Sequence, residues 1–109
     1  MINVTIYKDS NKSICGFHVS GHAGYADAGK DIVCAGVSTL VVTISNAIEK
    51  FTADEFECFE DEKAGDVSLR FTNTISKESD ILMNTLVLGL TDISDSYGKK
   101  YLKISYKEV

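Results

Sequence analysis

Apolar residues fall at every second position in two short segments near the start of the chain. The first segment contains Ile2, Val4 and Ile6, and the second contains Cys15, Phe17 and Val19. A polar turn at residues 9–12 separates them. A period of two is typical of a strand with one buried face. The sequence therefore predicts an N-terminal β-hairpin in which Cys15 packs on the same face as Phe17.

Two longer segments repeat their apolar residues at steps of three and four, which is the pattern of an amphipathic helix. From Cys34 onward the apolar positions are Val37, Leu40, Val41, Ile44, Ala47, Ile48 and Phe51. Ser76 is a good N-cap for the second segment, with Glu78 and Asp80 in its first turn. The apolar positions that follow are Leu82, Leu86, Val87, Leu90 and Ile93. Each segment predicts a helix with one buried stripe.

Three further strands are predicted at residues 56–59, 67–71 and 101–106, with a turn at residues 61–65 between the first two. The resulting order ββαββαβ contains no repeat, linker or low-complexity segment. Two helices are enough to cover one face of one sheet. We therefore expect a two-layer α+β fold with a five-stranded sheet, in a single domain that spans residues 1–109.

The composition narrows the classes of function. Hydrophobic residues make up 44% of the chain and charged residues 25%, as in ordinary soluble proteins. The longest apolar run, residues 40–44, is too short to span a bilayer, and the first residues lack the features of a signal peptide. We therefore expect a cytoplasmic protein with no membrane contact. The net charge of −5 disfavours direct contact with nucleic acid and suits a basic protein or peptide as partner.

The cysteines and histidines give no sign of a metal site. The three cysteines form no C-x-x-C pair, so we expect free thiols, with Cys15 and Cys58 as packing residues in strands. His18 and His22 would lie ~13 Å apart in an extended chain, too far to chelate one metal. His18 is then a strand residue that points away from the buried face, or a polar group near the site. No metal and no other cofactor is expected.

The loop at residues 21–33 is the most informative part of the chain. It ends at Cys34, in the first turn of the predicted helix, where unpaired amides and the helix dipole favour a negative charge. A thiol there can have its pKa lowered enough to ionise at working pH. His22, at the start of the loop, can fold back to act as its base. Thiol, imidazole and helix N-terminus together predict a cysteine-nucleophile site, although a small buried thiol that opens a helix is the plainer alternative.

Residues around this pair have two interpretations each. The amides of Cys34 and Ala35 could bind an oxyanion, because the small side chains there leave the backbone open. Asp31 and Asp27 could orient the imidazole, but solvated carboxylates or helix caps are favoured. Ser38, one turn after Cys34, is either a site residue or an ordinary helix serine.

The loop itself should move. The glycines Gly21, Gly24 and Gly29 would let it open for a substrate and close over it. We expect the segment from Ala23 to Val33 to be mobile without substrate, because it lacks an apolar anchor before Ile32.

The same loop also matches a phosphate-binding motif up to its last position. The match runs from Gly24 to Gly29 and Lys30, and Asp31 then stands where Ser or Thr should follow. A carboxylate would repel the phosphate, and the helical pattern begins several residues too late to meet it. Nucleotide binding is therefore a minor alternative.

The blocks at residues 21–25 and 29–38, Gly-His-Ala-Gly-Tyr and Gly-Lys-Asp-Ile-Val-Cys-Ala-Gly-Val-Ser, resemble the bacterial ribosomal-processing cysteine protease family, Prp. Size and element order agree over essentially the whole chain. The resemblance implies that a cytoplasmic homodimer removes a short N-terminal extension from a large-subunit ribosomal protein, the twenty-seventh in conventional numbering. It implies Cys34 as nucleophile and His22 as general base. Roles for Asp31, Ser38 and Tyr25, in orienting the base or contacting substrate, stay open.

In the implied mechanism the Cys34 thiolate attacks the scissile carbonyl, amides at the helix start hold the oxyanion, and His22 protonates the leaving amine. A non-catalytic ribosome-assembly module would keep the same fold without a reactive thiol. Thiol reactivity separates that alternative from a protease, and nucleotide titration tests the phosphate-binding alternative.

Overall fold

The computed structural model describes residues 1–27, 29–61 and 63–109. Its elements follow the predicted order ββαββαβ. They are β1 (Ile2–Lys8), β2 (Ile14–Ser20), α1 (Ile32–Phe51), β3 (Phe56–Asp61), β4 (Asp66–Phe71), α2 (Lys77–Tyr97) and β5 (Leu102–Glu108). The two-layer α+β prediction is confirmed.

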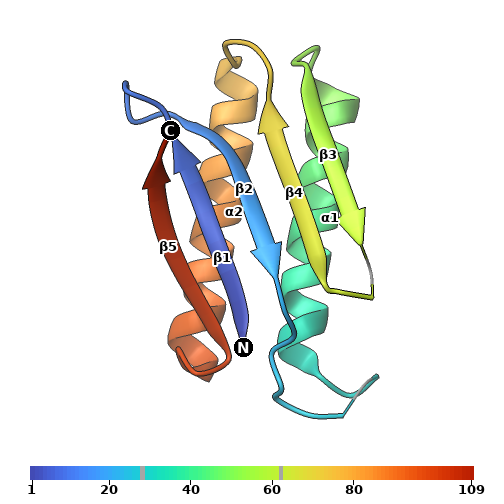
Figure 1. Ribbon diagram of the computed structural model, residues 1–109. Helices are drawn as coiled ribbons and strands as arrows, with labels where there is room; N and C mark the ends of the chain where they lie inside the picture. The colour runs from blue at the N-terminus through green and yellow to red at the C-terminus, as the bar shows by residue number, and fades with distance from the viewer. Residues whose placement is uncertain (28, 62) are drawn as a thin grey trace.

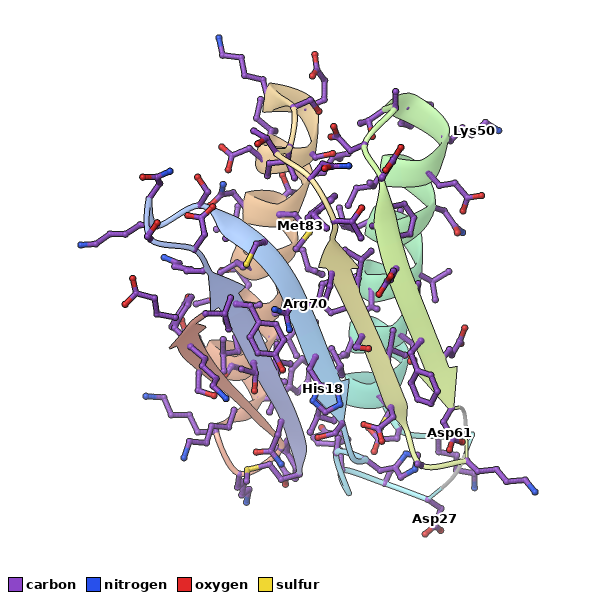
Figure 2. All side chains as sticks on the ribbon, turned by 45° about the horizontal axis from the view of Figure 1, so that its top comes forward. His18, Asp27, Lys50, Asp61, Arg70 and Met83 are labelled. Carbon is purple, nitrogen blue, oxygen red and sulfur yellow. The ribbon has the colours of Figure 1, made fainter. Side chains whose placement is uncertain are left out.

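The strands form one five-stranded mixed sheet in the order β3-β4-β2-β1-β5. β1 pairs antiparallel with β2 and parallel with β5 along their whole lengths. Both helices cover the same face of this sheet, α2 behind the side of β1 and α1 behind the side of β3 and β4 (Figure 1). None of the described helices covers the other face, on which His18 and Arg70 lie, while Met83 lies behind the sheet (Figure 2).

The core fills the space between the two layers. The predicted alternation in β1 is confirmed, because Ile2, Val4 and Ile6 are all buried. From α1 the buried residues are Val33, Val37, Val41, Ile44 and Ile48, and from α2 they are Ser79, Met83, Leu86, Leu90 and Ser94. Phe51, predicted to end the buried stripe of α1, is 72% exposed because the helix ends there, beyond the edge of the core.

A bulge in β2 corrects the prediction for Cys15. Tyr7 pairs with Gly16 and Lys8 pairs with Ile14, so Cys15 is the extra residue on its strand. A bulge of this kind shifts the alternation of the side chains by one position. Ile14 is therefore buried and Cys15 is only half-buried. The prediction that Cys58 is a packing residue is also wrong, because its side chain is exposed.

The first helix begins two residues earlier than predicted, at Ile32, with Asp31 as its N-cap. The apolar stripe starts with Val33 rather than with Cys34, and Ile32 is 53% exposed. By length and composition alone this helix is apolar enough to cross a membrane. In this fold its buried stripe packs against the sheet and α2.

The second helix begins at a dense hydrogen-bond cluster, and its predicted cap is confirmed. Ser76 Oγ accepts from the Ser79 amide. The amide and hydroxyl of Ser76 donate to Asp54 at 3.1 and 2.5 Å, and the Ser79 hydroxyl donates to the same carboxylate. These hydrogen bonds, chiefly from the hydroxyls of Ser76 and Ser79, hold the pKa of Asp54 below its ordinary value.

Candidate active site

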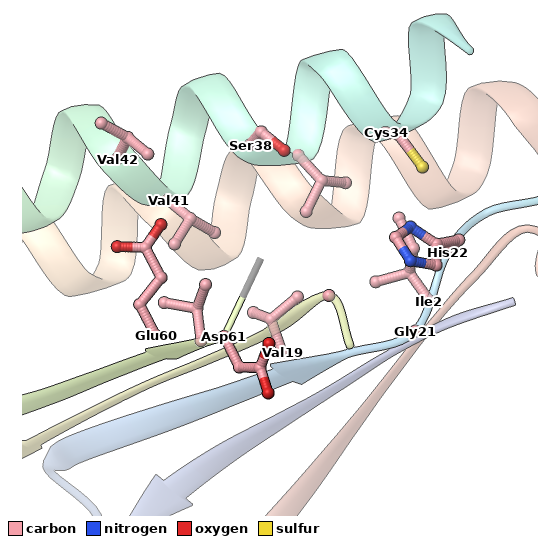
Figure 3. A pocket seen from close by; sticks show the side chains of 13 residues that line it. Ile2, Val19, Gly21, His22, Cys34, Ser38, Val41, Val42, Glu60 and Asp61 are labelled. Carbon is pink, nitrogen blue, oxygen red and sulfur yellow. The ribbon is translucent and has the colours of Figure 1, made fainter. Parts of the chain in front are cut away.

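A cavity of about 360 Å³ opens between the N-terminal half of α1 and the sheet (Figure 3). It is lined by Ile2, Val19, Gly21, His22, Cys34, Val37, Ser38, Val41, Val42, Glu60, Asp61, Gly65 and Val67. Three of the sequence candidates, His22, Cys34 and Ser38, therefore meet in one place. The β3–β4 hairpin forms the wall opposite α1.

Cys34 lies in the first turn of α1 and points from the helix into this cavity. Asp31 Oδ1 accepts hydrogen bonds from the amides of Val33 and Cys34, both at 3.0 Å. The amide of Ala23 donates to Cys34 Sγ at 3.2 Å. Because Ala23 follows His22 in the chain, this contact ties the beginning of the loop to the thiol.

His22 is exposed at the mouth of the cavity, and the Cys34 sulfur points toward its ring (Figure 3). Within residues 1–27, 29–61 and 63–109 no hydrogen bond joins the imidazole to the thiol, whose hydrogen bond comes from Ala23 instead. The imidazole and the thiol thus share the cavity, as the loop-to-helix spacing predicted.

Gly65 is a site residue that sequence reasoning missed. A Cβ built there would lie 2.7 Å from the carbonyl oxygen of Gly21 and 3.2 Å from His22 Cε1, and its φ of +66° favours glycine. The β3–β4 turn therefore packs directly against the strand end that carries the imidazole. The only sequence signal was a glycine at the end of a predicted turn, and Glu62 in that turn lies outside the described residues.

The structure corrects the predicted ionisation of the nucleophile. Burial is the main cause that raises the pKa of the Cys34 thiol above its ordinary value. The Ala23 amide works in the opposite direction, but the nearby Asp31 carboxylate raises the pKa further. A negative charge on the cap offsets the favourable field of the helix N-terminus. This raised pKa favours the protonated thiol, so a base beside Cys34 would help it to react.

The predicted oxyanion hole does not fit this geometry. The Cys34 amide donates to Asp31 Oδ1, and the Ala35 amide donates to the Asp31 carbonyl at 3.1 Å as part of the helix. Both donors are therefore already engaged. The Ala23 amide is the donor that the structure places beside the sulfur.

Asp31 is a helix cap, which was the favoured interpretation, and its hydrogen bonds go to backbone amides rather than to His22. Oδ2 accepts from the Tyr25 amide at 3.1 Å, while Oδ1 caps α1. Partial burial works to raise the pKa of this carboxyl, but the amides of Cys34 and Tyr25 outweigh it and hold the pKa below its ordinary value. Asp27 is exposed, and its carbonyl accepts from the Lys30 amide in a turn.

Tyr25 supplies the anchor that the loop was predicted to lack. Its ring makes edge-to-face contacts with Tyr97 at 5.6 Å and Tyr101 at 5.0 Å, at the end of α2 and the start of β5. Gly21, Gly24 and Gly29 all have positive φ, between 69° and 87°. The glycines shape the loop, and Tyr25 attaches it to the far end of the other helix.

The structure does not support the phosphate-binding alternative. Ala28, within the Gly24–Lys30 motif, lies outside the described residues. The helix begins at Ile32, so the expectation that it starts too late is wrong. The Asp31 carboxylate nevertheless occupies the capping amides where a phosphate would bind.

His18 pairs with Asp66 at 2.8 Å on the sheet face without helices, away from the cavity. Among the residues that the structure describes, no group of His, Cys, Asp and Glu side chains could hold a metal ion.

Comparisons with known proteins point the same way as the cavity. A family model described as cysteine protease Prp matches residues 1–103. The ribosomal processing cysteine protease Prp of Staphylococcus aureus is 28% identical over 107 residues, which cover 98% of this chain and 100% of that protein. The protein of the same name from Bacillus subtilis is 30% identical over 101 residues, 89% of this chain and 90% of that protein.

Solved structures agree with the fold. The crystal structure of S. aureus Prp with a covalently linked product peptide superposes with a TM-score of 0.93 at 28% identity, covering 98% of this chain and 100% of that one. The complex of S. aureus Prp with a substrate peptide superposes with a TM-score of 0.87 at 27% identity and the same coverage.

Proposed function

Since the chain belongs to the cysteine protease Prp family, we propose that it removes the short N-terminal extension of a large-subunit ribosomal protein, the twenty-seventh in conventional numbering. One observation carries this proposal. Cys34 and His22 line one open cavity, with the Ala23 amide at the sulfur. The S. aureus relative with a covalently linked product peptide supports a peptide as the occupant of the equivalent cavity.

In the proposed first step, the peptide enters the cavity and His22 takes the proton of the Cys34 thiol as the sulfur attacks the scissile carbonyl carbon. A base is needed because the pKa of the resting thiol is raised. The developing oxyanion accepts from the Ala23 amide, which leaves the sulfur as the new carbon–sulfur bond forms. The imidazolium then protonates the leaving amine, and a thioester remains on Cys34.

The second step releases the enzyme. His22 takes a proton from a water molecule, and the hydroxide attacks the thioester carbonyl. The carbon–sulfur bond breaks, the imidazolium returns its proton to the sulfur, and the product leaves as a carboxylic acid that ionises in water.

The test is incubation of the purified protein with the extended ribosomal precursor, followed by mass spectrometry of the products. We expect one shortened product, and none with a Cys34→Ala variant as control. A precursor that binds tightly but stays intact would instead support the non-catalytic assembly module.

We also propose that the protein acts as a homodimer in the cytoplasm, where a ribosomal precursor is made. In support, α2 exposes Ile81 by 64% and Leu88 by 62%, two turns apart on one stripe of the helix. Exposed apolar side chains on one stripe of a helix are suited to contact with another protein. Sedimentation should give about twice the chain mass of 11.9 kDa, and cell fractionation tests the compartment. A monomer at micromolar concentration would contradict the dimer.

A further inference from the structure

The cavity at Cys34 continues along α1 into a second hollow of about 140 Å³. Val41, Val42, Glu60 and Val67 line both spaces. The second hollow adds Ser45, Asn46, Glu49, Phe56 and Cys58. The two together form one groove between α1 and β3, which we name the α1–β3 groove.

The length of this groove suits an extended peptide. Val42 and Ser45 follow Cys34 by 8 and 11 positions on the same helix, which is about 12 to 16 Å along its axis. An extended chain advances about 3.3 Å per residue, so the second hollow lies four to five peptide residues from the scissile bond.

The two parts of the groove differ in chemistry. The first cavity has valines on both walls, Val19, Val37 and Val67, and its two carboxylates, Glu60 and Asp61, both come from β3. The second hollow has a carboxylate on each wall, Glu49 from α1 and Glu60 from β3. Figure 3 shows the Glu60 carboxylate reaching from β3 toward α1, level with Val41 and Val42.

Within residues 1–27, 29–61 and 63–109 the Glu60 carboxylate has no ion-pair partner. The ion pair found in this part of the chain joins His18 and Asp66. The pKa of the Cys58 thiol reflects the negative charge in the second hollow. The residue is exposed overall, but partial burial of its thiol is the main cause that raises the thiol pKa, and the charges of Glu60 and Glu49 raise it further. Both carboxylates therefore act on the same small space.

Ser45 gives an independent sign that the second hollow is incomplete. Its Oγ atom is buried and has no hydrogen-bond partner among the described residues. A buried hydroxyl without a partner is destabilising, and most buried polar atoms in folded proteins are paired. Ser45 lines the second hollow together with both carboxylates, so a donor group that entered it would lie among these three side chains.

We infer that the second hollow of the α1–β3 groove binds a basic side chain, lysine or arginine, of the substrate peptide, four to five residues from the scissile bond, with Glu60 as its main partner. This inference rests on the proposed protease function. A cationic N–H donor matches the carboxylates of Glu60 and Glu49 and the free hydroxyl of Ser45. An apolar peptide side chain would leave all three groups without a partner.

The test is a series of peptides that carry lysine or glutamine in turn at each of the six positions on either side of the scissile bond. We expect one position, four or five residues away, where lysine raises kcat/KM about 3- to 10-fold over glutamine, with a smaller ratio at high salt. Glu60→Gln should abolish this preference, and Glu60→Lys should reverse it in favour of glutamate. The matched control is Glu57→Gln, which removes the same charge from the opposite face of β3, paired with Arg70, and should keep the preference.

A preference that is unchanged in Glu60→Gln, or no lysine preference at any position, would overturn the inference. Failure of the protease proposal looks different, because the wild-type protein would then cleave none of the peptides. In that case the affinities of the lysine and glutamine peptides for a Cys34→Ala variant, measured by titration, still test the hollow directly. Equal affinities there would also overturn the inference.

Discussion

Both helices have a carboxylate at their N-terminus, but the two carboxylates make different contacts. At the N-terminus of α2, the Ser76 hydroxyl caps the helix and the Asp54 carboxylate stands behind it, held by hydroxyls. At the N-terminus of α1, the carboxylate of Asp31 is itself the cap, and its second oxygen reaches back to the loop at Tyr25. Ser76 and Asp54 stabilise the start of α2. Asp31 stabilises the start of α1, holds the loop at Tyr25, and also places a negative charge beside Cys34.

This difference shows what a carboxylate does to a nucleophile at a helix N-terminus. The dipole alone would favour a thiolate. With Asp31 on the capping amides, the pKa of Cys34 is raised instead. The N-terminus of α1 thus orients Cys34 in the cavity but does not by itself ionise the thiol. A base has to come from elsewhere in the cavity, and His22 lies there.

The largest effect is expected from removing the thiol that α1 presents. Cys34→Ser should bind the precursor but cleave it at least about 10³-fold more slowly, because a hydroxyl is a much weaker nucleophile without stronger activation. Single-turnover cleavage and binding titration measure the two properties. Cys15→Ser, which changes a thiol that lines neither hollow of the groove, is the control. Cleavage retained in Cys34→Ser would rule out the mechanism.

His22→Ala should lower the single-turnover rate about 10²- to 10⁴-fold, since both thiol activation and leaving-group protonation depend on the imidazole. His18→Ala removes the other histidine and its pair with Asp66 on the opposite sheet face, so the cleavage rate should not change. Equal losses in the two variants would show a structural effect rather than a catalytic one.

The two carboxylates that stand at helix starts can be compared directly by changing each to asparagine. Asp31→Asn removes a charge that raises the pKa of Cys34, so the pH profile of thiol alkylation should move to lower pH and the rate at pH 7 should rise several-fold. Asp54→Asn, near the start of α2, should leave this profile unchanged. Asp31→Asn should slow cleavage less than His22→Ala, and an equally deep loss would indicate a catalytic triad.

Both carboxylates should also contribute to acid sensitivity. Their pKa values are lowered in the folded protein, so their stabilisation is complete above the ordinary carboxyl pKa and is lost as the pH falls through the lowered values. Urea denaturation at pH 7 and pH 3 should show a loss for the wild type about 1 kcal/mol larger than for either asparagine variant. Identical pH dependence in all three proteins would contradict the shifts.

The smallest effect is expected at the loop anchor. Tyr25→Ala removes two edge-to-face contacts, of about 0.5–1.5 kcal/mol each, while the Tyr25 amide still bonds to Asp31. Hydrogen exchange at residues 23–27 should therefore become faster, by more than at the amides of the core strands. Tyr106→Ala, near the other end of β5, is the control. Fast exchange in the wild-type loop would support the original expectation of a mobile segment instead.

Local patterns in the sequence predicted much of the molecule. Alternation located the strands, and Ser76 marked the start of α2, because each depends on neighbours close in the chain. That His22 and Cys34 line the same cavity was expected from a loop that joins a strand to a helix. These features need no knowledge of how distant segments pack.

The features that were missed depend on such packing. The bulge at Cys15 is defined only by its pairing with β1. Gly65 matters because its turn lies against Gly21 and His22, more than 40 positions earlier. The raised pKa of Cys34 arises from burial and from where the Asp31 carboxylate points, which spacing along the chain does not determine.

The parallel pairing of β1 with β5 has a consequence for the order of events during synthesis. Ile2 lines the catalytic cavity, and its amide donates to the carbonyl of Tyr101 at 2.8 Å, just before the last strand. One wall of the cavity therefore depends on β5, which is synthesised after the other strands and helices and pairs with the edge of β1. A nascent chain that already contains Cys34 and His22 still lacks the contact between β1 and β5. The catalytic residues are therefore synthesised before the cavity around them is complete.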